Sequence, residues 1–172
     1  MSEDNNFYIR PSEAEDIMYL KDNLRQADIE EITATGSNPL VSLCEGYIFS
    51  QECYTCIYND KPSGMFGLSY FGDKQGSIWF LGTDDLQKVP KEWLICGRQY
   101  INHFLEIYPI LSNMVSIDNR VHIRWLKHLG AIFSAPYEVN GNLFRDFYFL
   151  QPSSKPNGKA TNGKVKCEKR EV

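Results

Sequence analysis

The stretch VSIDNRVHIRWLKHLGAIF, residues 115–133, carries the densest run of local structural signals in the chain. A strand pattern ends at Ile117, and the side chains of Asp118-Asn119 are suited to cap a following helix. Apolar residues then recur at helical spacing on one face: Ile123, Leu126 and Leu129. Gly130 suits the left-handed position that ends a helix, and Ile132-Phe133 begins a new strand. The stretch therefore predicts a strand, a capped helix and a second strand.

On both sides of this stretch, the sequence alternates between strand and helix patterns. The N-terminal half predicts a strand at 7–10, a helical segment from a Ser12/Glu15 capping box to the turn at Gly36, and a helix from Asn38-Pro39 to Ile48. An antiparallel meander follows, with strands at 53–58, 65–71 and 77–81. A long helix runs from Pro90 to Tyr108, and a strand follows at 111–117. The last strand pair, 132–133 and 143–150, is joined through Pro136 and an Asn140-Gly141 turn.

This order of elements predicts an α+β fold, an α/β sandwich in which a mixed, mostly antiparallel sheet has helices on both faces. With 172 residues, 42% of them hydrophobic, the chain can form one domain with a real core. We place that domain at residues 1–152. No apolar run approaches the length that a membrane-spanning helix needs.

The charge is distributed unevenly between this domain and the C-terminal residues 153–172. Residues 1–152 contain 12 basic and 20 acidic side chains, whereas the last 20 residues contain six basic and two acidic ones. The tail has no aromatic residue, so we expect it to be disordered. It is either a solubilising terminus or a basic arm for nucleic acid or an acidic partner. The net charge of −4 argues against a protein that coats DNA.

Five cysteines occur in the chain: Cys44, Cys53, Cys56, Cys96 and Cys167. An odd number without a secretion signal favours reduced thiols. Cys53 and Cys56 have the spacing of a redox or zinc motif, but no second Cys or His pair accompanies them. A strand would also point the two thiols to opposite faces of the sheet. We therefore expect ordinary buried or half-buried cysteines and no metal site.

The motifs of residues 115–133, with their element order, resemble the GNAT (Gcn5-related N-acetyltransferase) fold over about residues 7–150. Further motifs resemble one phage family, the GNAT-like internal virion protein A family of short-tailed phages. These motifs are Gly82-Thr83-Asp84 after Trp79-Phe80-Leu81, Tyr108-Pro109, Asp118-Asn119 and His122-Ile123-Arg124-Trp125-Leu126. The phage resemblance implies a role in building the virion and does not by itself imply catalysis.

GNAT enzymes bind acetyl-CoA at a splayed strand and at a glycine-rich loop before a helix N-terminus. The resemblance maps these cofactor contacts onto Leu81, Gly82, Thr83 and Asn119. The corresponding loop here, residues 82–92, has one glycine and carries Asp84 and Asp85, which oppose a diphosphate. We therefore expect no cofactor, with acetyl-CoA as the cofactor if the chain is an enzyme.

The acid–base chemistry of a GNAT enzyme is also altered. Leu126 stands where GNAT enzymes often have a tyrosine that protonates the leaving thiolate. His122 is the candidate substitute, and its alternative role is that of a histidine holding the start of its helix. Glu45, Glu52 and Asp118 are available as a general base, and their spacing selects none of them.

Arg124 and Trp125 lie off the apolar face of the predicted helix and form a candidate protein-binding pair. The alternative is that Trp125 packs in the core. Our leading hypothesis is a phage protein that acts in virion assembly by binding virion proteins; the rival is an acetyl-CoA-dependent N-acetyltransferase. The implied location is the host cytoplasm during infection, with the virion as an alternative.

Overall fold

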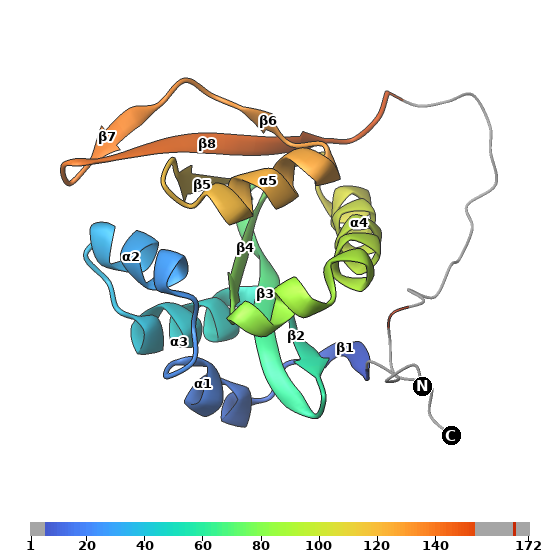
Figure 1. The fold of residues 1–172 in the computed structure, drawn as a ribbon. Coiled ribbons are helices and arrows are strands. Elements are labelled where there is room, and N and C mark those ends of the chain that lie inside the picture. The colour runs from blue at the N-terminus through green and yellow to red at the C-terminus, as the bar shows by residue number, and fades with distance from the viewer. Residues whose placement is uncertain (1–5, 154–166, 168–172) are drawn as a thin grey trace.

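The computed structural model describes residues 6–153 and Cys167, and it has the predicted α+β architecture (Figure 1). The strands are β1 (Phe7–Pro11), β2 (Ser50–Tyr58), β3 (Lys61–Gly72), β4 (Gln75–Gly82), β5 (Ile110–Ser116), β6 (Ile132–Phe133), β7 (Tyr137–Val139) and β8 (Asn142–Leu150). The helices are α1 (Ala14–Leu20), α2 (Gln26–Ala34), α3 (Pro39–Phe49), the short 3₁₀ helix η1 (Asp84–Lys88), α4 (Pro90–Ile107) and α5 (Arg120–Leu129).

The strands form one sheet in the order β1-β2-β3-β4-β5-β8-β6, with β7 paired to β8. Every pairing is antiparallel except β4 with β5, which are parallel and joined by α4. A parallel pair needs a crossover of this kind, because a tight turn can join only antiparallel strands. The predicted mixed, mostly antiparallel sheet is therefore confirmed.

Helices cover both faces of the sheet, as the sequence predicts (Figure 1). On one face, α1, α2 and α3 pack through Ile17, Ile32 and Leu43 against Met65 of β3. On the other face, residues of α4 and α5 pack against the sheet around Phe66 in a larger aromatic core. The two cores are separate because successive residues of β3 point to opposite faces.

Local capping signals explain where several helices begin and end. The Asn38 side chain accepts a hydrogen bond from the Val41 N–H and starts α3, and Asn119 caps α5 through the His122 N–H. Gly130 ends α5 with φ 97°, a left-handed conformation that glycine adopts without strain. Asn140 (φ 49°) and Gly141 (φ 79°) form the tight turn between β7 and β8.

The prediction of one helical segment from Ser12 to Gly36 is wrong. The structure has two helices there, and the capping box is formed by Glu13 and Asp16. The Asn23 side chain donates to the Tyr19 carbonyl and so satisfies the end of α1 in place of a further helical turn.

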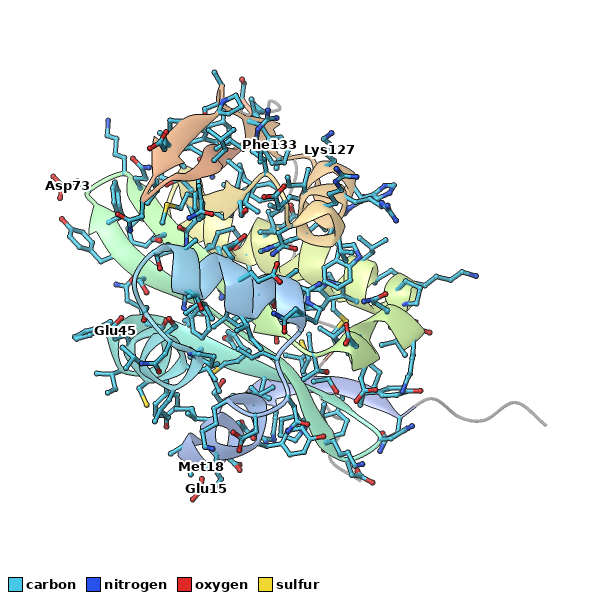
Figure 2. All side chains as sticks on the ribbon, turned by 60° about the vertical axis from the view of Figure 1, so that its left-hand side comes forward. Glu15, Met18, Glu45, Asp73, Lys127 and Phe133 are labelled. Atoms are coloured by element: carbon cyan, nitrogen blue, oxygen red, sulfur yellow. A yellow bond between two sulfur atoms is a disulfide. The ribbon has the colours of Figure 1, made fainter. Side chains whose placement is uncertain are left out.

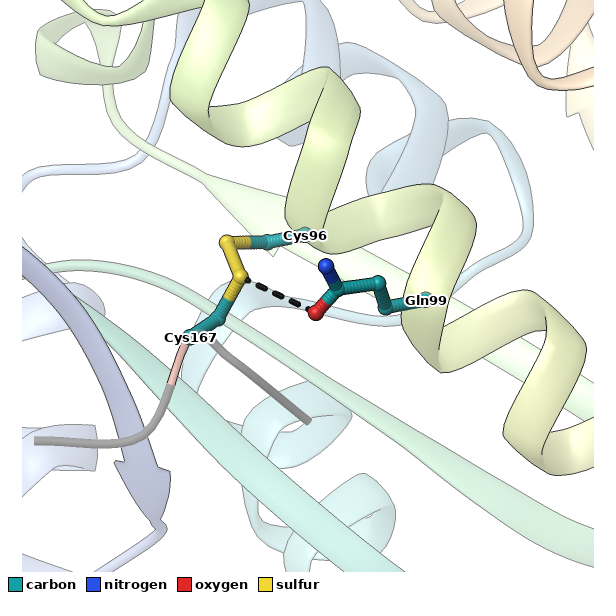
Figure 3. Close-up of a disulfide and its surroundings, with 3 residues drawn as sticks. All are labelled: Cys96, Gln99 and Cys167. Carbon is teal, nitrogen blue, oxygen red and sulfur yellow. Dashed lines mark hydrogen bonds between the residues drawn. A yellow bond between two sulfur atoms is a disulfide. The ribbon is translucent and has the colours of Figure 1, made fainter. Parts of the chain in front are cut away.

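The expectation of reduced cysteines is wrong for Cys96 and Cys167, which form a disulfide between α4 and the C-terminal region (Figure 3). The backbone carbonyl of Cys167 also accepts a hydrogen bond from the Ile9 N–H, 3.0 Å away, at the outer edge of β1. Residues 154–166 and 168–172 of the tail lie outside the described residues. The prediction that the tail is disordered falls on these residues. Sequence spacing alone could not show that Cys167 reaches α4.

The described residues contain no helix that is both long and apolar enough to cross a bilayer. Cys53 and Cys56 are unpaired thiols, and burial raises the pKa of both. Among the residues described, no group of three or more histidine, cysteine or acidic side chains is arranged to hold a metal ion.

Candidate functional site

The candidate site lies where β4 and β5 separate. The two strands pair over only three positions, Gln75 to Ser77 of β4 with Ile110 to Ser112 of β5. At the next position the Asn113 side chain, not the backbone, donates to the Ile78 carbonyl at 2.7 Å. Beyond this point a cavity of about 510 Å³ runs between the strands, lined by side chains from the helices on both faces.

Helix α2 closes one end of this divergence with acidic side chains. Asp28 Oδ2 accepts a hydrogen bond from the Gly82 N–H, 2.9 Å away, at the end of β4. Glu31 Oε2 accepts from the Ser116 N–H, also at 2.9 Å, at the end of β5. Asn119 donates through Nδ2 to both carboxylates, at 3.1 and 3.2 Å. We call Asp28, Glu31 and Asn119 the α2 clasp, because they connect the two separated strand ends.

A buried arginine compensates the charge of the clasp. Arg25 and Asp28 are 3% and 1% exposed, and their closest N–O distance is 2.7 Å. The guanidinium also lies 4.9 Å from the Trp125 ring and 5.8 Å from the Phe80 ring, at cation–π distance. The same residue uses its backbone N–H to bind the Gly82 carbonyl at 2.9 Å. Both polar backbone groups of Gly82 are therefore satisfied by α2 and its N-cap.

Glu31 is the titratable member of the clasp in the neutral pH range. Burial raises the pKa of its carboxyl to about 7, and the nearby Asp28 charge adds to this rise. Hydrogen bonds from Ser116 and Asn119 act in the opposite direction, because they favour the carboxylate.

His122, the candidate acid, is buried in an aromatic environment. Its ring lies 5.8 Å from Phe80 and 6.4 Å from Phe147. Burial lowers the pKa of its imidazole to about 4, so the ring is neutral at pH 7. Its Nδ1 has no hydrogen-bond partner among the described residues. The backbone N–H of His122 binds the Asn119 cap, which is the helix-start role that the sequence left open.

The candidate cofactor contacts are already used within the chain. The Thr83 N–H donates to the Ser63 carbonyl at 2.9 Å, and Thr83 Oγ1 accepts from the Asp85 N–H to begin η1. Leu81 lies in the β3–β4 ladder opposite Met65. Asn119 caps α5 and bridges the clasp. The structure thus brings Gly82 and Asn119 together through Asp28, while Leu81 and Thr83 serve β4 and the turn that follows.

The prediction that Trp125 is exposed beside Arg124 is wrong. Trp125 is 8% exposed and its ring lies 6.0 Å from that of Trp93 and 6.1 Å from that of Phe80. Arg124 is exposed, as predicted. The core position of Trp125, the alternative from the sequence, is the one observed, because α5 turns this side chain toward α4.

Sequence reasoning missed the α2 clasp. Its signal is the run Arg25, Asp28 and Glu31, three charged residues three positions apart and therefore on one side of a short helix that also has to bury Ile32. Their partners Gly82, Ser116 and Asn119 lie 54 to 91 residues further along the chain.

Known proteins resemble this chain in sequence and in fold. A model of the family described as "Bacteriophage T7, probable scaffold protein Gp13" matches residues 61–138. The probable scaffold protein gp13 of Escherichia phage T7 is 29% identical over 118 residues, which are 66% of this chain and 78% of that protein. The resemblance to a phage family inferred from the motifs is confirmed.

Solved structures share this fold, and several of them are described as acetyltransferases. Ard1 from Thermoplasma volcanium has a TM-score of 0.65 at 15% identity, over 86% of this chain and 99% of that one. A GNAT-family acetyltransferase from Bacillus anthracis has a TM-score of 0.62 at 11% identity, over 84% and 94%. Spermidine N-acetyltransferase from Vibrio cholerae, in complex with CoA and spermine, has a TM-score of 0.59 at 15% identity, over 84% and 95%. These likenesses confirm the GNAT fold.

Proposed function

We propose that this chain, a homologue of a phage scaffold protein on a GNAT fold, acts in phage assembly by binding a virion protein and does not transfer an acyl group. The likeness to the phage scaffold protein supports the assembly role, and the hydrogen bond from the Gly82 N–H to the Asp28 carboxylate carries the part of the proposal that concerns acyl transfer. The cofactor contact that the GNAT resemblance assigns to Gly82 is therefore filled by the protein's own side chain.

The residues present do not fit acetyl-CoA. A diphosphate needs unpaired N–H groups and positive charge. Here the Gly82 and Thr83 N–H groups have partners inside the chain, and Asp84 and Asp85 follow them. Lys88 Nζ forms an ion pair with Asp85 Oδ1 at 2.7 Å. A Cβ added to Gly82 would lie 2.6 Å from the Phe80 ring, so the backbone on this side is already covered by an aromatic side chain.

Calorimetry with acetyl-CoA tests this part of the proposal. We expect no heat of binding at millimolar ligand. Binding at micromolar concentration would overturn it and would support the rival function, an N-acetyltransferase. The fold and the cavity between β4 and β5 favour that rival, which needs Asp28 to release Gly82 and His122 to donate a proton.

The binding part of the proposal concerns virion proteins of the same phage. Each virion protein, purified singly, is mixed with the full chain, and binding is measured by calorimetry. We expect at least one of them to bind with a saturable isotherm. If none binds, the assembly function is wrong. Arg124, exposed on α5, stays a prediction from the sequence, and Arg124→Ala tests it with binding and the melting temperature as readouts.

The proposed location is the host cytoplasm during infection, where assembly takes place. For residues 153–172, both predictions from the sequence remain: a solubilising terminus, and a basic arm for nucleic acid or an acidic partner. Deleting these residues and measuring retention on double-stranded DNA tests the arm for nucleic acid, since unchanged retention would exclude it.

A further inference from the structure

We propose that the virion partner docks across the mouth of the cavity between α2 and α3, through a basic segment that inserts an apolar side chain. This inference rests on the proposed function and assigns it a surface. The cavity mouth is identified by exposure: among the described residues that line the cavity, those exposed to solvent are Thr35, Glu45 and Phe49. All three belong to the α2–α3 region, so the cavity opens on this side of the sheet.

The mouth has an apolar rim that nothing in the described chain covers. Phe49 is 71% exposed although it lines the cavity, and its neighbour Ile48 is 68% exposed. Large exposed apolar side chains gathered beside a cavity are typical of a protein-binding site.

The interior of the cavity is suited to an apolar side chain. Its walls include Ile32, Trp79, Met114 and Phe144, and Trp79 packs directly over Gly46 of α3. A side chain entering between α2 and α3 would therefore meet aliphatic and aromatic surface in place of water.

The acidic side chains around the mouth favour a partner segment that carries basic residues beside its apolar side chain. Glu45 lies on the outer side of α3 (Figure 2). A second hollow on the other side of α2 shares Glu31 with the cavity and adds Glu30 and Asp118. In the part of the chain that the structure describes, no lysine or arginine lines either hollow. Such a surface attracts lysine and arginine side chains and repels the phosphates of a nucleic acid.

A photocrosslinking experiment with the full chain tests the location. Phe49 is replaced by photoreactive p-benzoylphenylalanine, and the control chain carries the same residue at Ile95, which is 59% exposed on α4. Each chain is irradiated with the virion protein that binds in calorimetry. We expect a crosslink from position 49 and none from position 95, to a peptide with an apolar residue flanked by lysine or arginine. Equal crosslinking from both positions, or attachment to an acidic peptide, would overturn the proposal.

Matched charge reversals test the acidic mouth. Glu45→Lys and Glu106→Lys change the net charge equally, but Glu106 lies exposed on α4, on the opposite face of the sheet. We expect Glu45→Lys to weaken binding about tenfold and Glu106→Lys to leave it unchanged, with equal melting temperatures. Phe49→Ser should also weaken binding about tenfold.

The outcomes separate this inference from the proposed function. If the wild-type chain binds a virion protein while Phe49→Ser and Glu45→Lys bind it equally well, the docking site is wrong and the assembly function stands. If the wild-type chain binds no virion protein, both are wrong.

Discussion

The buried Asp28 side chain connects three separate parts of the chain through its carboxylate. Its carboxylate receives donors from Arg25, Gly82 and Asn119, so a charge that is 1% exposed remains well solvated by protein groups. The same contacts use the N–H group at the end of β4. The residue that pairs with the buried Arg25 guanidinium therefore also satisfies the N–H group of Gly82.

We expect Asp28→Ala to lower the free energy of unfolding by about 3–5 kcal/mol, because it leaves the Arg25 guanidinium buried without its counterion. Urea unfolding measures the change. The control is Asp22→Ala, whose side chain is 68% exposed in a surface ion pair with Lys21 and should cost less than about 1 kcal/mol. Equal losses for the two variants would contradict the assignment.

The raised pKa of Glu31 predicts a pH dependence of stability. The folded state holds the Glu31 proton up to about pH 7, whereas the unfolded state releases it near the ordinary value of 4.5. The folded form therefore binds more protons between these values, and the contribution of Glu31 to stability falls as the pH rises from 4.5 to 7.

His122 acts in the opposite direction, since its lowered pKa makes stability rise with pH between about 4 and 6.5. The comparison must therefore be made between the wild type and Glu31→Gln, which share His122. We expect the stability advantage of the wild type to fall by about 3 kcal/mol between pH 4.5 and 7.5 in urea unfolding. Glu30→Gln, an exposed neighbour on α2, should show no such trend; a flat difference for Glu31→Gln would refute the prediction.

At the level of elements, two helical glycines have different surroundings. A Cβ added to Gly46 of α3 would lie 2.5 Å from Trp79 Cζ2, whereas one added to Gly97 of α4 would meet Leu129 at an ordinary 3.5 Å. We expect Gly46→Ala to destabilise the protein by about 1–3 kcal/mol through displacement of Trp79. Gly97→Ala should instead stabilise it by up to about 1 kcal/mol through higher helix propensity. Thermal unfolding of both variants checks the opposite signs.

The elements that the sequence predicts well are those whose ends are set locally. Asn38, Asn119 and Gly130 begin or end helices through contacts within a few residues, and all three positions are confirmed. The break between α1 and α2 was missed, because Arg25 is held by the Gly82 carbonyl in a distant strand.

The candidate site was predicted less completely for the same reason. The sequence could identify the altered loop at Asp84 and Asp85 and the leucine at position 126. It could not show that the Asp28 carboxylate accepts a hydrogen bond from the Gly82 N–H, because the two residues meet only when α2 packs against the end of β4.

For the molecule as a whole, the Cys96–Cys167 disulfide joins residues 71 positions apart. By the chain-entropy model, a closed loop of this length stabilises the folded state by about 4 kcal/mol. We expect reduction with dithiothreitol to lower the free energy of unfolding by that order. A Cys96→Ser/Cys167→Ser variant should be insensitive to the reductant, whereas continued sensitivity would assign the effect to another cause.

The same bond has a mechanical consequence. When the oxidised chain is pulled by its two ends, the segment between Cys96 and Cys167 cannot extend, because the force passes through the two sulfur atoms. At ~3.4 Å per residue, the fully stretched oxidised chain should be about 240 Å shorter than the reduced one. An optical-trap extension curve recorded before and after reduction would measure this hidden length directly.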